Sequence, residues 1–463
     1  MSSATKAATA ATAATAATAA TVAAVTAVPT TSIKQMISGI QIPTGNTIFY
    51  IFAAVLVIGT IIGVIVVWSK NLQFATVSNV RRITAQQKGM VDDGLSPYYK
   101  TKRGIMDETV ATDEKCLINF APLSVFQPGF LGPAYNGVYD ERDGVSYALK
   151  AGARCFVLPI DYHDDPSLNQ TLFHPVGAPC LLVRDQGGSI RSLNSGSIEK
   201  ITQAIADMAF NDIVSVNSDP IILVLYFNRT PDPTTKDYLR FCSQVAKELS
   251  PLTSYFLGQT SEGVYNRQGR QDQLLYSPLN LFQRKVLVFA NINLSLFRNT
   301  RSVGLAPFQP REDLDYLVNL RLYRQVESEL GATVLAGNNE FPRGYVQPPS
   351  YFTVIPANRL QETVDTTKIR WTVVLPPYPS NPSTEVVKKM LDTYGVQCVP
   401  FFMFDFDKKN NKTNDTANLN LWKDTAWRAK PAPVRFHIPP PITAAAPSPQ
   451  MNAMGGKLST PNL

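Results

Sequence analysis

Chemically reactive side chains are scarce in this chain of 463 residues, which contains three histidines and five cysteines. The sequence has no HExxH motif, no P-loop, no Gly-x-Gly-x-x-Gly fingerprint and no Ser/His/Asp order. It therefore lacks the motifs of zinc proteases, P-loop nucleotide-binding proteins and dinucleotide-binding enzymes. It also lacks a stripe of Lys and Arg with interleaved aromatics. The formal net charge of +7 thus indicates a mildly basic surface, and we expect no nucleic-acid partner.

The five cysteines are Cys116, Cys155, Cys180, Cys242 and Cys398. They are far apart, their number is odd, and no CxxC pair or Cys/His cluster occurs. We therefore expect no structural zinc, no other metal and no cofactor. Most of them lie in apolar runs typical of strands or helices. This placement predicts free, buried thiols, which favours a reducing compartment for the folded domain.

Both ends of the chain are low in complexity. Residues 1–47 begin with a long Ala/Thr tract, and residues 438–463 are rich in Pro and Ala. The N-terminal tract is not a signal peptide, because no apolar segment follows a basic start there. Segments of this composition bury too little apolar surface to fold alone. We expect both tails, together with the barrel surface, to contact protein partners.

One long apolar run stands out near the N-terminus. Ile48–Trp68 contains no charged residue and no proline over 21 residues. At ~1.5 Å per residue, a helix of this length crosses a hydrocarbon core of ~30 Å. Tyr50 and Trp68 fall at its two ends, where aromatic rings prefer the membrane interface. The run predicts a single transmembrane helix with the lipid bilayer as partner.

The positive charges on either side of this run differ in number. Lys34 is the nearest on the N-terminal side, whereas Lys70, Arg81, Arg82 and Lys88 follow on the C-terminal side. Cytoplasmic flanks of membrane helices carry an excess of Lys and Arg. We therefore predict a signal anchor with the C-terminal domain on the cytoplasmic side, in agreement with the free thiols.

Residues 69–110 are expected to form a polar linker, and residues 111–437 alternate between strand-like and helical patterns. The expected strands are Ala153–Ile160, Cys180–Arg184, Pro220–Phe227, Lys285–Ile292, Arg370–Leu375 and Val396–Phe404. The expected helices are Ser197–Phe210, Thr235–Leu249 and Thr384–Tyr394. Such alternation indicates an α/β domain with a parallel sheet. This many units favour a closed (β/α)8 TIM barrel over two separate domains.

Several segments resemble one family of barrels. Tyr147–Asp161, YALKAGARCFVLPID, looks like the end of the second strand of the phosphatidylinositol-specific phospholipase C catalytic barrel. Further pieces resemble the family in its own order, at Ala178–Ile190, Glu199–Phe210, Asp219–Phe227, Gly395–Phe404 and Trp427–Arg435. Together they span roughly residues 115–437. The resemblance implies a phospholipase-C-like TIM barrel.

The residues that this resemblance would assign to catalysis are different here. The family's first histidine falls in Asn119–Phe130, which has no histidine, and its second falls near Arg184 or Asp185. The implied calcium ligands fall at Val157 and Pro159, a later carboxylate near Tyr226 or Phe227, and the phosphate-binding lysine near Phe289. Phosphodiester cleavage needs an acid–base pair, and calcium needs several oxygen ligands. The substitutions predict a catalytically inactive barrel.

One acidic loop keeps a possible site. His163 lies in Asp161–Asp165, DYHDD, directly after an expected barrel strand. Barrel enzymes place catalytic groups at this end of the strands. His163, Asp161, Asp165 and Asp185 are therefore weak catalytic candidates, with Asp164 beside them. The alternative interpretation, which we favour, is a solvated acidic loop without chemistry.

Two classes of function follow from these patterns. The first is a membrane-anchored structural or adaptor protein with an inactive phospholipase-C-like barrel. One setting would be a minor capsid or inner-membrane protein of a large DNA virus, linking the membrane to the shell. The second is a lipid-head-group phosphodiesterase, a phosphoric diester hydrolase, or a lipid-binding protein with a relocated site around His163. We favour the first, which is not an enzyme.

Overall fold

The computed structural model describes most of the chain between residues 47 and 438. The described residues are 47–133, 136–185, 187–212, 214–232, 235–257, 274–292, 314–324, 344–376, 381–404 and 416–438, with side chains except at 47–54, 65–77, 324, 357 and 416. The chain divides into two units, Met1–Ala75 and Thr76–Leu463. The predicted N-terminal tract before residue 47 and the predicted tail after residue 438 lie outside the described residues.

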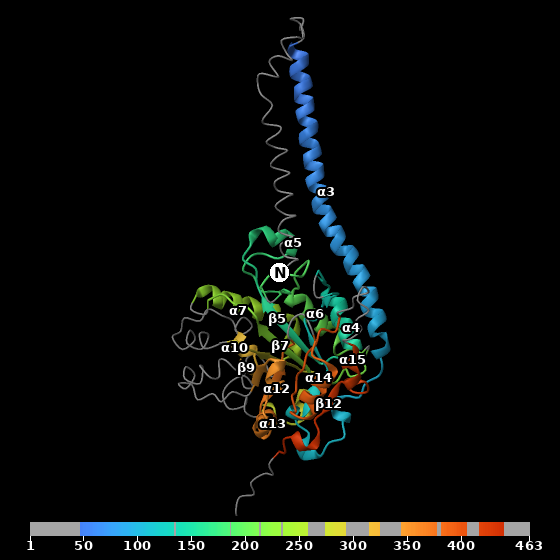
Figure 1. Cartoon of the computed structure of the whole chain (residues 1–463), viewed down its shortest axis with the longest axis vertical. Helices are drawn as coiled ribbons and strands as arrows, with labels where there is room; N and C mark the ends of the chain where they lie inside the picture. The colour runs from blue at the N-terminus through green and yellow to red at the C-terminus, as the bar shows by residue number, and fades with distance from the viewer. Residues whose placement is uncertain are drawn as a thin grey trace, which may run out of the picture. The chain divides into compact units, whose positions relative to one another are not determined.

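The second unit is built around a curled sheet of seven parallel strands (Figure 1). In spatial order the strands are β2 (Ser124–Phe126), β5 (Cys155–Asp161), β7 (Ile221–Phe227), β8 (Val286–Ala290), β9 (Leu320–Arg324), β10 (Gly344–Gln347) and β11 (Trp371–Val374). This spatial order is also their order along the chain. The side chains of β5 and β8 are buried throughout, and nearly all of those of β7 are. Such continuous burial is typical of a parallel sheet covered on both faces.

A last extended segment connects the two edges of this sheet. Cys398 bridges Val373 of β11, and Phe401 bridges Val125 of β2, both in parallel orientation. Two backbone hydrogen bonds support each bridge. The amide of Cys398 donates to Thr372 O at 3.0 Å, and the amide of residue 126 donates to Phe401 O at 3.0 Å. We call residues 398–401 the closing segment, because its two bridges join β11 and β2, the two edges of the curled sheet.

The helices that cover the sheet begin with side-chain caps. α4 (Glu141–Lys150), α6 (Ile198–Met208), α7 (Lys236–Glu248) and α14 (Thr384–Asp392) are capped by Asp140, Ser197, Thr235 and Ser383, respectively. Each cap accepts a hydrogen bond from an amide in the first turn, which would otherwise have no partner. α13 (Leu360–Ile369) lacks such a cap. In the four capped helices, apolar residues recur every three or four positions and face the sheet.

The smaller elements complete the domain. They are β1 (Phe120–Pro122), β3 (Phe130–Leu131), β4 (Val138–Tyr139), β6 (Cys180–Leu181), β12 (Trp427–Ala429), α5 (Asn169–Leu172), α10 (Leu314–Leu317), α12 (Pro349–Thr353) and α15 (Thr416–Leu419). β1 pairs with β12, and β3 pairs with β4, each antiparallel. Since β1 directly precedes the first barrel strand, its pairing with β12 ties the end of the domain to its beginning.

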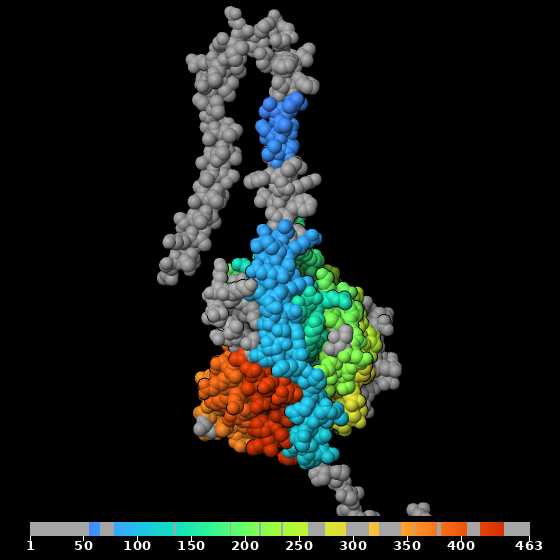
Figure 2. Space-filling view, turned by 90° about the vertical axis from the view of Figure 1, so that its right-hand side faces the viewer, coloured from blue at the N-terminus to red at the C-terminus, as the bar shows by residue number. Residues whose placement is uncertain are grey.

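A single helix, α3 (Thr47–Leu95), connects the two units. We expected residues 69–110 to be a polar linker, but the helix continues to Leu95. The part from residue 76 onward is a component of the second unit, and Figure 2 shows it in light blue against the folded body. Val91 and Leu95 are fully buried there, and Val80 and Ile83 pack on the same core.

Specific contacts hold this part of the helix in place. Lys88 Nζ lies 2.7 Å from Asp140 and 2.6 Å from Asp143, at the start of α4. Gly132 has a φ of +103°, and a Cβ there would lie 2.7 Å from Cδ of Gln87. The glycine therefore leaves room for the helix. These contacts explain why a segment with little visible periodicity is helical.

The predicted membrane helix Ile48–Trp68 lies within α3, with described side chains only at positions 55–64. Seven large apolar side chains among them are exposed: Val55, Leu56, Val57, Ile58, Ile61, Ile62 and Val64. In the part of the chain that the structure describes, no helix is long and apolar enough to cross a membrane.

Most strands and helices expected from the sequence are present. β5, β7, β8 and β11, and helices α6, α7 and α14, fall where the patterns predicted them. Two predicted strands need correction. Cys180–Arg184 is not a barrel strand, because β6 pairs antiparallel with β5 and lies off the barrel path. Val396–Phe404 forms no regular strand and contributes only the two isolated bridges of the closing segment. β2, β9 and β10 were missed. The sequences of β9 (LRLYR) and β10 (GYVQ) contain polar residues, and β2 has only three residues, whereas the short strand β8 (VLVFA) was recognisable because it is wholly apolar.

Candidate functional site

The carboxyl ends of β5 and β7 carry a buried charge cluster around Asp161, the last residue of β5. The Asp161 carboxylate is fully buried. It accepts hydrogen bonds from Arg184 Nε at 2.8 Å, from Asn228 Nδ2 at 3.2 Å and from the Tyr162 amide at 2.7 Å. Because a buried carboxylate is costly unless it is paired, this set of donors explains how Asp161 stays inside the fold.

Two arginines surround this carboxylate. Arg184 also donates to Tyr162 O and Gly188 O, each at 2.8 Å. Arg229, just after β7, lies 3.8 Å from Asp161 and 3.0 Å from Asp164, and its guanidinium stacks on the Tyr162 ring. Burial alone would lower the pKa of Arg229, but its hydrogen bond to Asp164 and the two acidic charges raise the pKa overall. Of the two arginines, Arg229 is the more accessible to solvent, since 36% of its side chain is exposed against 14% for Arg184.

His163 has a structural environment. Its side chain is almost fully buried. Its Nδ1 lies 3.1 Å from the carbonyl oxygen of Asp165, and its Nε2 lies 2.9 Å from that of His174. Both ring nitrogens thus face backbone acceptors of the same loop. These two contacts tie the ring to its own loop.

The remaining nominated carboxylates also have local partners. Asp165 accepts the Ser167 amide at 2.8 Å and caps a short 3-10 turn. Hydrogen bonds from the Ser167 side chain and backbone lower the pKa of Asp165. Asp185 forms an ion pair with Arg191 and accepts the Ser189 amide at 2.9 Å. The Arg191 hydrogen bond is the main reason that the pKa of Asp185 is lowered. Neither carboxylate has a raised pKa suited to a general acid.

The structure therefore brings only part of the predicted set together. Asp161 and Asp164 share Arg229, whereas the His163 ring faces loop carbonyls and Asp185 pairs within its own turn. Among the described residues, no group of three or more His, Cys, Asp or Glu side chains is placed to hold a metal ion. Sequence reasoning nominated Asp185 as a weak candidate but named Arg184 only as a place where a histidine is missing. It overlooked Arg229 entirely, although Arg229 is the second residue after a predicted strand.

Apolar side chains occupy other positions where the resemblance implied chemistry. Val157 and Phe289 lie in the middle of β5 and β8 and are fully buried. Phe126, the last residue of β2, and Phe402, the residue after the closing segment, meet edge to face with their ring centroids 5.0 Å apart. Both rings are buried. This aromatic pair fills the part of the barrel mouth that lies next to β2.

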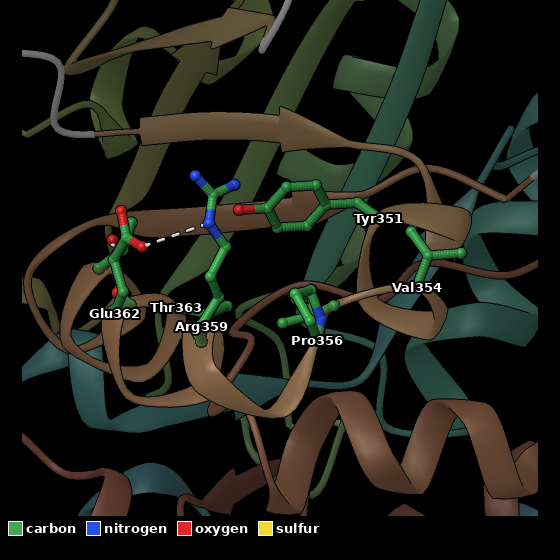
Figure 3. Close-up of a pocket in the computed structure, with 8 residues that line it drawn as sticks. Tyr351, Val354, Pro356, Arg359, Glu362 and Thr363 are labelled. Carbon is green, nitrogen blue, oxygen red and sulfur yellow. Dashed lines mark hydrogen bonds and ion pairs between the residues drawn. The ribbon is translucent and has the colours of Figure 1, made fainter.

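A small surface pocket lies elsewhere, between α12 and α13 (Figure 3). Its volume is about 200 Å³, below the range of roughly 300–1,000 Å³ that is typical of small-molecule sites. Figure 3 shows the Tyr351 hydroxyl and the Arg359 guanidinium pointing toward one another. Arg359 lies 3.9 Å from Glu362, and both side chains are about 70% exposed. None of the residues nominated from the sequence lines this pocket.

Outside the barrel mouth, the half-buried carboxylate of Glu248 should contribute to the pH dependence of stability. Burial, with the charge of Glu199 adding to it, raises the pKa of Glu248 to about 7. A carboxyl group with a raised pKa contributes stability below its ordinary value of 4.5, and that contribution is lost as pH rises through about 7. Glu248→Gln should therefore stabilise the protein at pH 8 by about 2–3 kcal/mol and change little at pH 4.5. Urea unfolding at both pH values measures this, and equal effects at the two would contradict it.

Comparisons with known proteins give structural neighbours only. Neither protein-family models nor curated protein sequences match this chain. PLC21 from L. pealei and PLC21 from S. officinalis each align with a TM-score of 0.46 and 14% identity, over 70% of this chain and 38% of theirs. A calcium-dependent phosphoinositol-specific phospholipase C from Pseudomonas sp. aligns with a TM-score of 0.36 and 9% identity, over 69% of this chain and 98% of its own. This chain thus spans well under two thirds of the two PLC21 chains. At these values the likeness concerns the fold alone.

Proposed function

We propose that the chain is a membrane-linked structural or adaptor protein, and that its barrel serves as a scaffold and not as a catalyst. One observation carries this proposal: the His163 ring and the nominated carboxylates are held in contacts inside the protein. Both nitrogens of His163 face loop carbonyls, and Asp161 is enclosed by Arg184, Asn228 and the backbone. General acid–base catalysis needs a group within hydrogen-bond reach of the substrate, and these groups already have other partners.

The membrane link rests on the first unit. Its described side chains at 55–64 include seven exposed large apolar residues on consecutive turns of one helix. Exposed apolar patches of this kind mark interaction surfaces. A lipid bilayer satisfies a helix that is apolar on all sides, because it needs no polar face. Anchoring with the second unit on the cytoplasmic side stays a prediction from the flanking charges.

The setting in a viral inner membrane or capsid is a hypothesis from the sequence architecture. It predicts that the protein is found at fixed stoichiometry in purified membrane-bearing particles. Its presence only in ordinary cell membranes would exclude that setting and would leave the scaffold proposal unchanged. Protein partners would bind the barrel surface or the tails in either case.

A second candidate function is the binding of an anionic lipid head group at the barrel mouth. Arg229 favours it, since its guanidinium is partly exposed at the carboxyl end of β7 and stacks on Tyr162. Arginine forks bind phosphate groups well. Asp161 and Asp164 already neutralise much of this charge, so a phosphate would have to displace Asp164 from Arg229. This competition makes the scaffold the better-supported proposal.

The proposals are separated by vesicle flotation of the full-length protein. For a membrane-linked scaffold, we expect flotation with neutral phosphatidylcholine vesicles that persists in 1 M salt (a concentration at which the screening length is ~3 Å). Head-group binding alone predicts flotation only with vesicles containing phosphatidylinositol, lost in high salt and lost in Arg229→Ala. The double variant Ile58→Arg and Ile62→Arg places two charges in the apolar run and should abolish flotation of an anchored protein.

Catalysis is tested in the same preparation. The scaffold proposal expects no release of inositol phosphate from phosphatidylinositol vesicles, with or without calcium. Turnover that His163→Ala abolishes would overturn the proposal and establish the alternative phosphodiesterase. Turnover that His163→Ala leaves unchanged would equally contradict a purely structural barrel and would point to Arg229 and its neighbours. The exposed variant His437→Ala is the matched control for the loss of a histidine.

A further inference from the structure

Two of the five cysteines meet inside the barrel. Sγ of Cys155 lies 3.4 Å from Sγ of Cys398. Both side chains are fully buried and are free thiols. Cys155 is the first residue of β5, and Cys398 is in the closing segment. Since β2 runs between these two strands, the contact crosses the concave side of the sheet.

This pair is separate from the charge cluster at the barrel mouth. Asp161 stands six residues further along the same strand, which corresponds to roughly 20 Å. The thiols therefore lie toward the amino end of the barrel, the end that TIM-barrel enzymes do not use for catalysis. Cys155 and Cys398 are 243 positions apart in sequence. A bond between them would enclose most of the domain.

The closing segment is the part of the barrel with the fewest strand contacts. β5 and β7 pair over six residues, whereas the closing segment is joined to each neighbour by one isolated bridge. One of its supporting hydrogen bonds, from the Phe401 amide to Ser124 O, is long at 3.4 Å. The closing segment is therefore expected to separate from its neighbouring strands more easily than the other strands separate from one another.

We infer that Cys155 and Cys398 form a reversible intramolecular disulfide that locks the closing segment of the barrel to β5. In this reaction a small-molecule disulfide is the oxidant. One protein thiolate attacks it and releases one thiol, and the second protein thiolate then attacks the mixed disulfide and releases the other. The two protein thiols lose two protons and two electrons, and the oxidant is reduced to two thiols. The sulfurs must approach by about 1.4 Å more to reach bonding distance.

Burial decides when this bond can form. Burial, and the neighbouring Cys398 thiol, raise the pKa of Cys155 far above its ordinary value, so the reactive thiolate is rare in the closed barrel. The oxidant also cannot reach a fully buried sulfur. Oxidation should therefore occur when the closing segment is open, during folding or in a local opening. Once formed, the bond constrains a long loop, which restricts the unfolded chain strongly.

The experiment treats the full-length protein with excess oxidised glutathione in urea below the unfolding transition, and then maps unreduced proteolytic peptides by mass spectrometry. We expect one dominant linked pair, Cys155 with Cys398, and a fall in titratable thiols from five to three. We also expect the midpoint of thermal unfolding to rise by several degrees and to return on addition of dithiothreitol. Faster oxidation at higher urea within this range would show that opening precedes the reaction.

Alanine variants provide the controls. Cys155→Ala and Cys398→Ala should each abolish both the linked peptide and the thermal shift, whereas Cys242→Ala, which removes another buried thiol, should retain them. If the first two variants do not fold, the peptide map of the unaltered protein still decides the question. Other pairings, intermolecular bonds, or five free thiols after oxidation would each overturn the inference.

Discussion

Asp161→Ala should lower the free energy of unfolding by about 3–5 kcal/mol, because it leaves Arg184 largely buried without its counter-charge. Only 14% of the Arg184 side chain is exposed, and none of Asp161. Arg184 would keep its bonds to two backbone carbonyls but would lose the carboxylate that balances its charge. Urea unfolding followed by circular dichroism measures the effect at pH 7.

Two further variants show whether charge balance is the cause. Asp164→Ala removes a carboxylate that is 63% exposed and pairs with Arg229, so it should cost less than about 1 kcal/mol. Combining Asp161→Ala with Arg184→Met should recover much of the lost stability, since no unpaired buried charge remains. If Asp161→Ala and Asp164→Ala are equally mild, Asp161 does not hold the barrel mouth together.

The second large effect concerns where the folded domain begins. A chain that begins at residue 100 should be much less stable than one that begins at residue 76, because it loses the buried part of α3. Full burial of a side chain such as Val91 or Leu95 contributes about 1.5–3 kcal/mol each. The pairing of Lys88 with Asp140 and Asp143 would be lost as well. Thermal unfolding of the two chains tests this.

Single substitutions isolate the packing contribution within the full chain. Leu95→Ala should cost about 2–5 kcal/mol, the usual cost of removing a large buried side chain. Arg82→Ala lies on the same helix but is exposed, and it should change stability by less than about 0.5 kcal/mol. Equal stability of Leu95→Ala and Arg82→Ala would mean that the helix is only a linker, as the sequence suggested.

How much of the fold could be predicted depended on the length of each element and on how continuous its apolar residues are. The seven-residue strands β5 and β7 and the amphipathic helices α6 and α7 have patterns long enough to recognise. β2, with three residues, shows no such pattern. Residues 180–181 were predicted to belong to the parallel sheet, but they pair antiparallel with β5. The prediction failed because apolar composition does not encode strand direction. Direction is set by the connection that precedes the strand, here the loop around His163.

For the candidate site, too, the sequence predicted where residues lie along the chain but not which residues contact them. The position of Asp161 and His163 at the end of a strand could be predicted from the sequence, and the structure has them there. The burial and ion pairing of Asp161 could not be predicted, because they depend on Arg184 and Arg229. These two arginines are 23 and 68 residues away from Asp161 in sequence. An acidic loop and an ion-pair network have the same composition. They differ only in what folds against them.

The sequence alone determined the apolar run near the N-terminus, the alternation of strands and helices and the scarcity of reactive groups, since composition and local periodicity are properties of neighbouring residues. The tertiary structure decided that α3 continues onto the domain, that Asp161 is enclosed by two arginines, and that Cys155 meets Cys398. Each of these depends on contacts between residues far apart in sequence. Such contacts arise only when the sheet curls and closes, and no local pattern records them.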